Sequence, residues 1–400
     1  QRLSRIEVLH GNRLMRTYSL GYHNEELFSL LSSVTMEGED GLSLPTLSFE
    51  YAQHSSQGRP LVTMNSAPNT DGLINGRATL DDVNGDGLPD ILYGDANNYR
   101  YYENLDGYTW SENATSLSGS PDQSLQSAET LLADINGDGF RDVVYKYGDQ
   151  FRYYPAGEIV EGQFLGFEEF VAMTTYGTPN YHWGLNTVKI SDLNKDGRTD
   201  MLYQPSADAL KQIINDEDNV LQEANLSALP LDVVFTDPKI SMTDFNGDGH
   251  LDFVKKDINF PNSSSGSRVR VWFGLGWGNY APEQEMAYVP TGDPNEFYLQ
   301  DVNKDGQTDL VRVSGSWVTY YLNTGRMSFT SAKGDFYGNP TSSQSQAILF
   351  GDMNGNTTTD VVWVMNDGKI KYLDIIQTYV GIICFFLCHY SFNDLCYYRL

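Results

Sequence analysis

The sequence predicts an all-β protein, and three observations favour this class. A short acidic loop of one pattern recurs six times in 400 residues, apolar runs of strand length flank each copy, and turn-forming residues separate these runs. Hydrophobic residues make up 40% of the chain and aromatic residues 13%, so it can bury a core and is no disordered acidic polymer. The 37 glycines fit a fold that is rich in turns.

The charge balance argues against a nucleic-acid partner. The formal net charge is −27 at pH 7, from 53 acidic and 26 basic residues. Such a chain repels the phosphates of DNA and RNA and the surface of an anionic membrane. We therefore predict protein partners and no nucleic acid, and we expect membrane contact only through the C-terminal tail.

The acidic loop sets the period of the chain. Its pattern is Asp-x-Asn-x-Asp-Gly-x-x-Asp, and complete copies begin at Asp82, Asp134, Asp192, Asp244 and Asp301. A sixth copy begins at Asp352, but Asn356 and Thr357 replace its acid at position 5 and its glycine at position 6. The copies start 51 to 58 residues apart, which is the length of about four short strands, as in one blade of a β-propeller. The repeat therefore predicts a propeller of about six four-stranded blades, alternatively seven, over residues 71–374.

Strands are expected on both sides of each loop. Before a loop, apolar residues alternate with polar ones, as at Val188 and Ile190. After it comes an apolar run that is rich in β-branched and aromatic residues, such as Ile91–Tyr93. The third repeat is the least regular. A further strand is predicted at residues 99–102, 151–154, 269–273, 318–322 and 369–373.

The residue types of the loop are those that bind a hard divalent cation. Calcium takes six to eight oxygen ligands, and alternate residues of a tight loop can turn their oxygens toward one point. Positions 1, 3, 5 and 9 offer carboxylate or amide oxygens, position 7 offers its backbone carbonyl, and glycine at position 6 permits a positive φ. The predicted cofactor is Ca²⁺, and the predicted ligands are Asp82, Asn84, Asp86, Leu88, Asp90, Asp134, Asn136, Asp138, Phe140, Asp142, Asp192, Asn194, Asp196, Arg198, Asp200, Asp244, Asn246, Asp248, His250, Asp252, Asp301, Asn303, Asp305, Gln307 and Asp309.

Two other interpretations of the loops are weaker. Asp-Gly and Asn-Gly pairs also form ordinary turns without an ion, but five identical ligand patterns at regular spacing favour a metal. The helix–loop–helix calcium motif needs a glutamate at position 12. That position holds Tyr93, Tyr145, Tyr203, Lys255, Arg312 and Trp363, so the motif is excluded. The sixth loop lacks the carboxylate at position 5 and the glycine that eases the turn at position 6. We therefore predict weak or no metal binding there, or a plain hairpin.

Calcium would take the place of disulfides in stabilising this fold. All three cysteines, Cys384, Cys388 and Cys396, lie after residue 383, so no disulfide scaffold is possible before them. Without an ion the aspartates of one loop would repel one another, so chelation should disorder or destabilise the loops. Cytosolic calcium is too scarce to fill sites of ordinary extracellular strength. We therefore predict a secreted or extracellular protein, alternatively one at the cell surface.

The loops resemble the FG-GAP/VCBS repeats of integrin α-type propellers over residues 71–374. In that family the ion stabilises the blade, so the resemblance implies the ligands named above. The preceding segment is similar to a stretch that precedes the propeller in the Salmonella plasmid-virulence B family and in B components of bacterial insecticidal toxin complexes, which are relatives of RHS-repeat proteins. This similarity implies a β-rich segment over residues 1–58 and a linker over residues 59–70. The runs that carry it are Arg2–Val8, Arg13–Tyr18, Leu30–Thr35 and Leu44–Tyr51.

The resemblance also implies a function. In those secreted toxins the propeller docks an RHS shell onto a channel-forming partner. We therefore expect a non-enzymatic, protein-docking scaffold whose partner is a channel-forming toxin subunit or an RHS shell. No shell or toxic domain follows in this sequence, so toxicity is not carried over. The alternative is an integrin-like adhesion or carbohydrate-binding module, tethered to a membrane by the tail.

Residues 375–400 form an apolar tail that contains all the cysteines. The stretch Ile375–Asn393 has no acidic residue, lysine or arginine and is barely long enough to span a bilayer. Gln377, Thr378 and His389 weaken that interpretation. Because the tail breaks the repeat, an unrelated extension or a truncated gene product is favoured at least as strongly as an anchor, and a closing strand is a further alternative.

No motif in the sequence predicts catalysis. There is no Gly-x-Ser-x-Gly elbow, phosphate-binding loop or zinc-protease helix, and the clustered carboxylates are explained as ligands. Tyrosine pairs such as Tyr101-Tyr102, Tyr153-Tyr154 and Tyr320-Tyr321 recur at one position of the repeat, which favours packing over sugar stacking. An enzymatic propeller would need convergent residues on its central axis. We therefore expect no enzyme activity.

Overall fold

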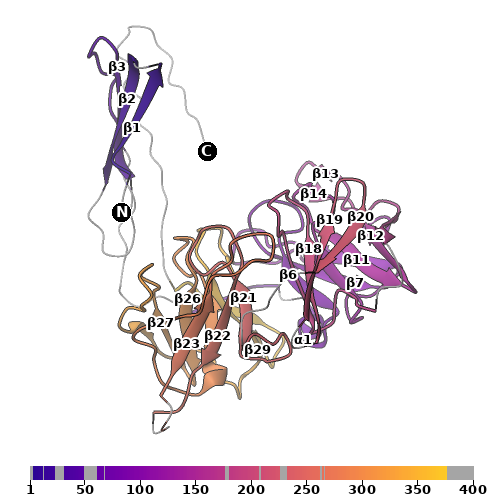
Figure 1. Ribbon diagram of the computed structural model, residues 1–400. Helices are drawn as coiled ribbons and strands as arrows, with labels where there is room; N and C mark the ends of the chain where they lie inside the picture. The colour runs from indigo at the N-terminus through magenta and orange to yellow at the C-terminus, as the bar shows by residue number, and fades with distance from the viewer. Residues whose placement is uncertain are drawn as a thin grey trace. The chain divides into compact units, whose positions relative to one another are not determined.

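The computed structural model describes residues 3–11, 13–22, 31–48, 61–66, 68–175, 180–206, 209–225, 232–261, 264 and 266–375. It has two compact units, one containing Gln1–Ser55 and the other spanning Ser56–Ile376 (Figure 1). Strands dominate both units, which confirms the predicted all-β class. The predicted tail lies, apart from Ile375, outside the described residues. Within these residue ranges, no helix is long and apolar enough to cross a membrane.

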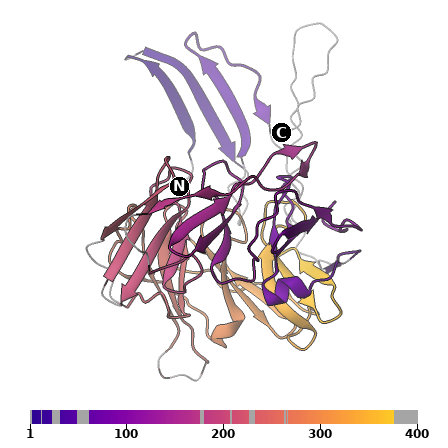
Figure 2. The ribbon, with the colours of Figure 1, turned by 90° about the vertical axis from the view of Figure 1, so that its right-hand side faces the viewer.

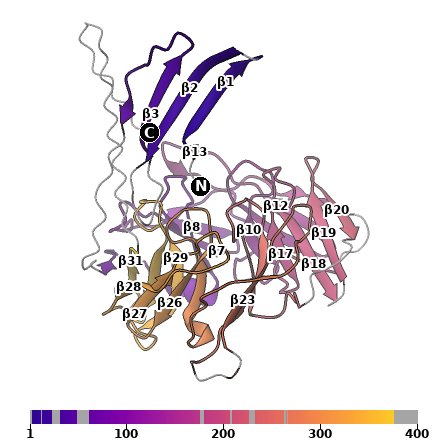
Figure 3. The same ribbon diagram turned by 60° about the vertical axis from the view of Figure 1, so that its left-hand side comes forward.

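The N-terminal unit contains one antiparallel sheet in the order β1-β2-β3-β4 (Figure 3). Ile6 pairs with Tyr18, which pairs with Met36 on the next strand. Because side chains alternate across a strand, these three apolar residues share one face of the sheet. The sheet confirms the small β-rich segment that was expected before the propeller. Its strands are β1 (Arg5–His10), β2 (Arg13–Tyr22), β3 (Leu31–Gly38) and β4 (Leu47–Ser48).

The second unit repeats one type of sheet, and its described residues form six such sheets, numbered in chain order. Sheet 1 is β6 (Ala78–Asp81), β7 (Asp90–Asp95), β8 (Asn98–Tyr102) and β9 (Thr115–Ser116); sheet 2 is β10 (Thr130–Ala133), β11 (Asp142–Tyr147), β12 (Gln150–Tyr154) and β15 (Val171–Ala172); sheet 3 is β17 (Val188–Ser191), β18 (Asp200–Ser206), β19 (Ala209–Asn215), β20 (Val220–Asn225) and β16 (Thr174–Thr175). Sheet 4 is β21 (Ile240–Thr243), β22 (Asp252–Asp257), β23 (Arg268–Trp272) and β24 (Gln284–Glu285); sheet 5 is β25 (Phe297–Gln300), β26 (Asp309–Ser314), β27 (Trp317–Tyr321) and β28 (Lys333–Phe336); sheet 6 is β29 (Ser345–Gly351), β30 (Asp360–Met365), β31 (Ile370–Leu373) and β5 (Val62–Thr63).

The further strands that the sequence predicted in five of the six repeats correspond to β8, β12, β23, β27 and β31. Sheet 3 departs from the common pattern because β16 adds to it in parallel with β20. Short elements connect the sheets: the hairpin β13 (Ile159–Val160) and β14 (Gln163–Phe164), the helix α1 (Asp71–Asn75) and the 3-10 helix η1 (Pro294–Glu296).

The first strand of the second unit belongs to its last sheet. Val62 and Thr63 of β5 pair with Tyr372 and Lys371 of β31. Figure 2 shows the yellow sheet 6 beside the purple segment that contains α1. The sequence assigns residues 62–63 to a linker, whereas their pairing joins the two ends of the unit and covers a strand edge.

Consecutive sheets pack against one another through buried side chains. Tyr101 and Val143 lie in a cluster between sheets 1 and 2, and Ile91 and Val362 lie in a cluster between sheets 1 and 6. Further clusters join sheets 2 and 3, sheets 3 and 4, and sheets 4 and 5. Tyr101 is fully buried, which supports the packing interpretation of the tyrosine pairs. Neighbour-to-neighbour packing that returns from the last sheet to the first is the arrangement of a β-propeller, and the number of blades stays a prediction.

Candidate metal centre

Each acidic loop joins the first strand of its sheet to the second. The aspartate at position 9 is the first residue of the second strand, as Asp90 is in β7 and Asp309 is in β26. We number the loops 1 to 6 after their sheets. The sequence placed each loop between two strands, and the structure confirms this placement in all six sheets.

The aspartate at position 1 organises the backbone of its loop. In loop 1, Asp82 Oδ1 accepts hydrogen bonds from the N–H groups of Gly85 (2.8 Å) and Asp86 (3.1 Å), and Oδ2 accepts from Gly87 (2.9 Å). The bond from position 6 to Oδ2 recurs in loops 2 to 5 at 2.8 to 3.0 Å. The glycine at position 6 has φ between +83° and +89° in these five loops, as the sequence predicted.

The side chains at positions 3 and 5 meet above this backbone. In loop 1, Asn84 Oδ1 accepts a hydrogen bond from the Asp86 N–H (3.0 Å), and Asn84 Nδ2 donates to Asp86 Oδ2 (3.2 Å). The Leu88 N–H donates to Asp86 Oδ1 (2.8 Å). The amide-to-carboxylate bond recurs in loops 2 to 5 at 2.8 to 3.1 Å. Oxygen donors from positions 1, 3 and 5 therefore lie close together in each complete loop.

The aspartate at position 9 has a second role that the sequence did not reveal. Asp309 is fully buried, and its carboxylate accepts hydrogen bonds from the N–H groups of Val302 (3.2 Å) and Asn323 (2.7 Å). It thereby ties its own loop to the end of the third strand. The same pair of bonds is made by Asp90, Asp142, Asp200 and Asp252.

Burial is also the main reason why the pKa of these aspartates is raised. Loss of hydration raises the pKa to about 7 for Asp90, Asp142 and Asp252, to about 6 for Asp200 and to about 8 for Asp309. The carboxylates at positions 1 and 5 of the same loop raise it further, while the two backbone hydrogen bonds oppose the shift. A nearby cation would favour the ionised form of each carboxylate.

Protein cations do not neutralise the loops. Among the described residues, no lysine or arginine forms an ion pair with a carboxylate at position 1 or 5. Lys195, at position 4 of loop 3, instead donates to the backbone carbonyl of Asp248 (3.1 Å). The negative charge of each loop is therefore left for solvent or for a bound cation.

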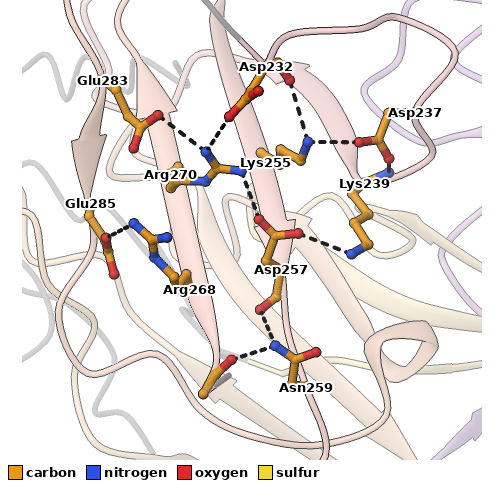
Figure 4. Close-up of polar contacts among 11 residues, drawn as sticks. Asp232, Asp237, Lys239, Lys255, Asp257, Asn259, Arg268, Arg270, Glu283 and Glu285 are labelled. Carbon is orange, nitrogen blue, oxygen red and sulfur yellow. Dashed lines mark hydrogen bonds and ion pairs between the residues drawn. The ribbon is translucent and has the colours of Figure 1, made fainter. Parts of the chain in front are cut away.

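Sheet 4 shows where basic side chains are used instead (Figure 4). Arg270 pairs with Asp257 of β22 (3.0 Å), Asp232 (3.2 Å) and Glu283 (3.3 Å). Lys255 pairs with Asp237 (2.9 Å). The Arg270–Asp257 pair joins β23 to β22, and the other pairs join these strands to the connections beside them. None of these pairs includes a carboxylate of loop 4.

The donor set of the complete loops fits a hard cation in its chemistry. Positions 1, 3 and 5 present only carboxylate and amide oxygens, which calcium prefers. In the described residues, no three acidic, histidine or cysteine side chains gather closely enough to form a metal-binding group by themselves. The predicted ligand set contains an amide and a backbone carbonyl, so such a group is not required. Calcium binding by the 25 residues named above stays a prediction.

Loop 6 keeps the turn that the sequence expected it to lose. Thr357 adopts φ +70°, and its N–H donates to Asp352 Oδ2 (2.6 Å), like the glycine of the complete loops. The N–H of Asn356 also donates to Asp352 Oδ1 (3.0 Å). These bonds hold a β-branched residue in a left-handed conformation, which costs about 1–2 kcal/mol.

Exchanging the residues at position 6 tests this strain. We expect Thr357→Gly to stabilise the calcium-free protein by about 1 kcal/mol, and Gly306→Thr, where φ is +85°, to destabilise it by a similar amount. Space is not limiting for Gly306, since the nearest atom to an added Cβ would be 3.7 Å away. Chemical denaturation measures both changes. Equal stability of all three proteins would show that the left-handed backbone is not strained.

Loops of neighbouring sheets contact one another. The hydroxyl of Thr308 in loop 5 donates to the Asp244 carbonyl of loop 4 (2.8 Å), and the hydroxyl of Thr359 in loop 6 donates to the Asp301 carbonyl of loop 5 (2.8 Å). In loop 4, a Cβ added to Gly247 would lie 2.9 Å from a backbone oxygen of loop 5. The loops therefore share one face of the second unit, which we call the loop face.

Three buried asparagines join the loops, and the sequence analysis missed them. The backbone N–H of Asn323 donates to the Asp309 carboxylate of its own sheet, while its Nδ2 donates to the Phe245 carbonyl of loop 4 (2.9 Å). Asn104 and Asn215 make the equivalent side-chain bonds to the carbonyls of position 2 in loops 6 and 2. A sequence signal exists, because each asparagine lies 14 or 15 residues after the aspartate at position 9 of its own loop.

Comparison with known proteins agrees with this geometry. The family described as FG-GAP-like repeat matches residues 82–145 and 301–363. Over these two stretches the chain is similar to FG-GAP-like repeats. These two matches contain loops 1, 2, 5 and 6. No curated protein sequence matches the chain.

Solved structures of similar fold include a toxin complex and a lectin. The TcdB2–TccC3 crystal structure matches with 19% identity and a TM-score of 0.48, over 92% of this chain and 18% of that chain. An Agrocybe aegerita lectin that recognises non-reducing terminal N-acetylglucosamine matches with 18% identity and a TM-score of 0.51, over 75% of this chain and 77% of that chain. The chain thus spans less than a fifth of the toxin-complex chain, and the likeness to the lectin supports the fold alone.

Proposed function

We propose that the second unit is a non-enzymatic, calcium-stabilised propeller that serves as a protein-docking scaffold of a secreted toxin-complex or RHS-like protein. One observation supports the proposed calcium binding. The complete loops hold oxygen donors of positions 1, 3 and 5 in the same backbone geometry, and no described lysine or arginine pairs with their acids. A cation from solution would neutralise charge that the protein leaves uncompensated.

The loops would stabilise the ring of sheets through their mutual contacts. In the proposed state, the acids at positions 1 and 5 and the amide at position 3 hold the ion. The position-1 residue is also the acceptor for the next loop, as Asp244 is for Thr308. A loop that an ion has ordered therefore keeps the acceptor for its neighbour in place. This coupling would stiffen the loop face and prepare it for a partner.

Exposed apolar side chains make the loop face the proposed docking surface. Trp277 is 57% exposed, and its backbone N–H donates to the Leu193 carbonyl of loop 3 (3.3 Å). Leu275 is exposed beside it, and Leu105 and Tyr108 are exposed in the corresponding connection of sheet 1. A tryptophan with an apolar neighbour is typical of the residues that dominate protein interfaces.

Two tryptophan variants test the docking surface. The partner proteins for the test are a purified RHS shell and a purified channel-forming toxin subunit. We expect Trp277→Ala to weaken binding at least tenfold in surface plasmon resonance, because it removes an apolar anchor. Trp317→Ala is the matched control, since Trp317 is 49% exposed but is the first residue of β27, at the end of sheet 5 opposite the loops. Equal binding by both variants and wild type would refute the proposed surface.

Trp317 also supports the second candidate, a carbohydrate-binding module. Its ring lies 5.6 Å from the ring of Tyr337, and both side chains are exposed. Exposed aromatic faces can stack on sugars. Glycan-array binding that Trp317→Ala abolishes and Trp277→Ala retains would favour this function over docking.

A further inference from the structure

Loop 6 has an acidic neighbour that its motif does not contain. Asp374 follows β31, two residues after Tyr372, which pairs with Val362. The register places Asp374 at the position that Glu103 occupies after β8, where Tyr101 pairs with Leu92. In sheets 2 to 5 the same position holds an apolar residue or proline: Pro155, Ile214, Phe273 and Leu322.

Both acids are directed at the loop of their own sheet. Asp374 Oδ2 accepts a hydrogen bond from Asn356 Nδ2 (3.1 Å), and Glu103 Oε1 accepts one from Asn84 Nδ2 (3.4 Å). Asp374 is 7% exposed, so its carboxylate is held in the interior beside the loop. The acid at this position therefore contacts the loop side chains that correspond to cation ligands.

Asp374 restores the charge that loop 6 has lost. A complete loop contains three aspartates, at positions 1, 5 and 9. Loop 6 has Asn356 at position 5, and the carboxylate of Asp374 touches the amide of that residue. With Asp352 and Asp360, it brings the number of carboxylates at loop 6 back to three. The remaining donors, Asn354 and the backbone, are those of the other loops.

An independent feature indicates a missing ligand at this place. The side chain of Tyr372 is 1% exposed, and its hydroxyl has no hydrogen-bond partner of normal geometry among the described residues. Tyr372 lies two residues before Asp374, so the two side chains lie on the same side of the chain at the end of β31. A buried hydroxyl without a partner is costly. A water molecule bound to a cation in the loop would supply the partner.

We propose that loop 6 is a sixth binding site for a hard divalent cation, completed by the carboxylate of Asp374 from outside the loop. This inference rests on the proposed calcium binding by loops 1 to 5. It reverses the sequence-based prediction of weak or no binding, because a carboxylate that follows the third strand takes the place of the missing acid. Only loop 6 combines an acid at this position with a missing aspartate at position 5, since loop 1 has its own full set of aspartates beside Glu103.

Counting bound calcium in the 400-residue chain tests the inference. We expect wild type to bind six calcium ions in equilibrium dialysis with metal analysis, and Asp374→Asn to bind five. Glu103→Gln is the matched control, because it removes the equivalent acid beside a complete loop, and it should still bind six. The double variant Asn356→Asp with Asp374→Asn moves the carboxylate into the loop and should recover the sixth ion even if the single variant is less stable.

The outcomes separate this inference from the proposed function. Equal calcium counts for wild type and Asp374→Asn overturn the sixth site. If both proteins bind five ions, the proposed calcium binding by loops 1 to 5 still holds. No bound calcium in wild type overturns both. Failure of the double variant to recover an ion lost in Asp374→Asn would show that the loss reflects damage to the sheet, and it would also overturn the sixth site.

Discussion

Removing calcium is expected to lower the midpoint of thermal unfolding (Tm) of this protein by about 10 °C or more. At a calcium concentration about 20 times the dissociation constant, each site adds about 2 kcal/mol to the stability. Five complete loops act on one propeller, and for a domain of this size about 1 kcal/mol shifts Tm by about 2–4 °C. Differential scanning calorimetry in calcium and in chelator measures the shift.

The size of the shift separates ion binding from plain turns. Adding excess calcium back to the chelated protein should restore Tm, while added magnesium should restore it less, because magnesium demands a stricter octahedral geometry. A Tm that is the same in calcium and in chelator would mean that the loops are ordinary hairpin turns. The prediction that the protein is located outside the cytosol would then have no support, because it rests on calcium binding.

Asp309→Asn is expected to destabilise the protein by about 3 kcal/mol even without calcium. Asp309 is fully buried, and each carboxylate oxygen accepts a backbone hydrogen bond, from Val302 or from Asn323. Above about pH 9, where Asp309 with its pKa of about 8 is ionised, replacing one oxygen by an NH₂ group sets a donor against a buried N–H, which loses a charge-assisted bond and leaves the donor unsatisfied. Denaturant unfolding of calcium-free protein measures the change.

Asp305→Asn is the control for this prediction. Asp305 is exposed at position 5 of the same loop, and its carboxylate accepts from the Gln307 N–H (2.9 Å) and from Asn303. We expect this variant to bind one calcium ion fewer and to keep nearly the stability of calcium-free wild type. If Asp309→Asn is also as stable as calcium-free wild type, the position-9 aspartate is a ligand only and does not hold the fold.

The repeat could be predicted from the sequence because its signal is local. A fixed nine-residue pattern, apolar runs on either side and a glycine at position 6 each reflect short-range chemistry, so they predicted each loop and the two strands that flank it. The positive φ of Gly87 and its counterparts follows from the same local requirement. Loop 6 shows the limit, since Thr357 keeps the turn through hydrogen bonds to Asp352.

The tertiary structure decided which of these local pieces meet. The amino-acid sequence alone determined the all-β class, the loop pattern and the residue types for a hard cation. Only the folded chain revealed that β5 completes sheet 6, that Asn323 joins two loops and that Asp374 faces loop 6. These contacts link residues from different strands or sheets, up to about 300 positions apart, and no local pattern encodes such a distance. These contacts are fixed by the hydrogen bonding of buried groups, which depends on which residues are neighbours in space.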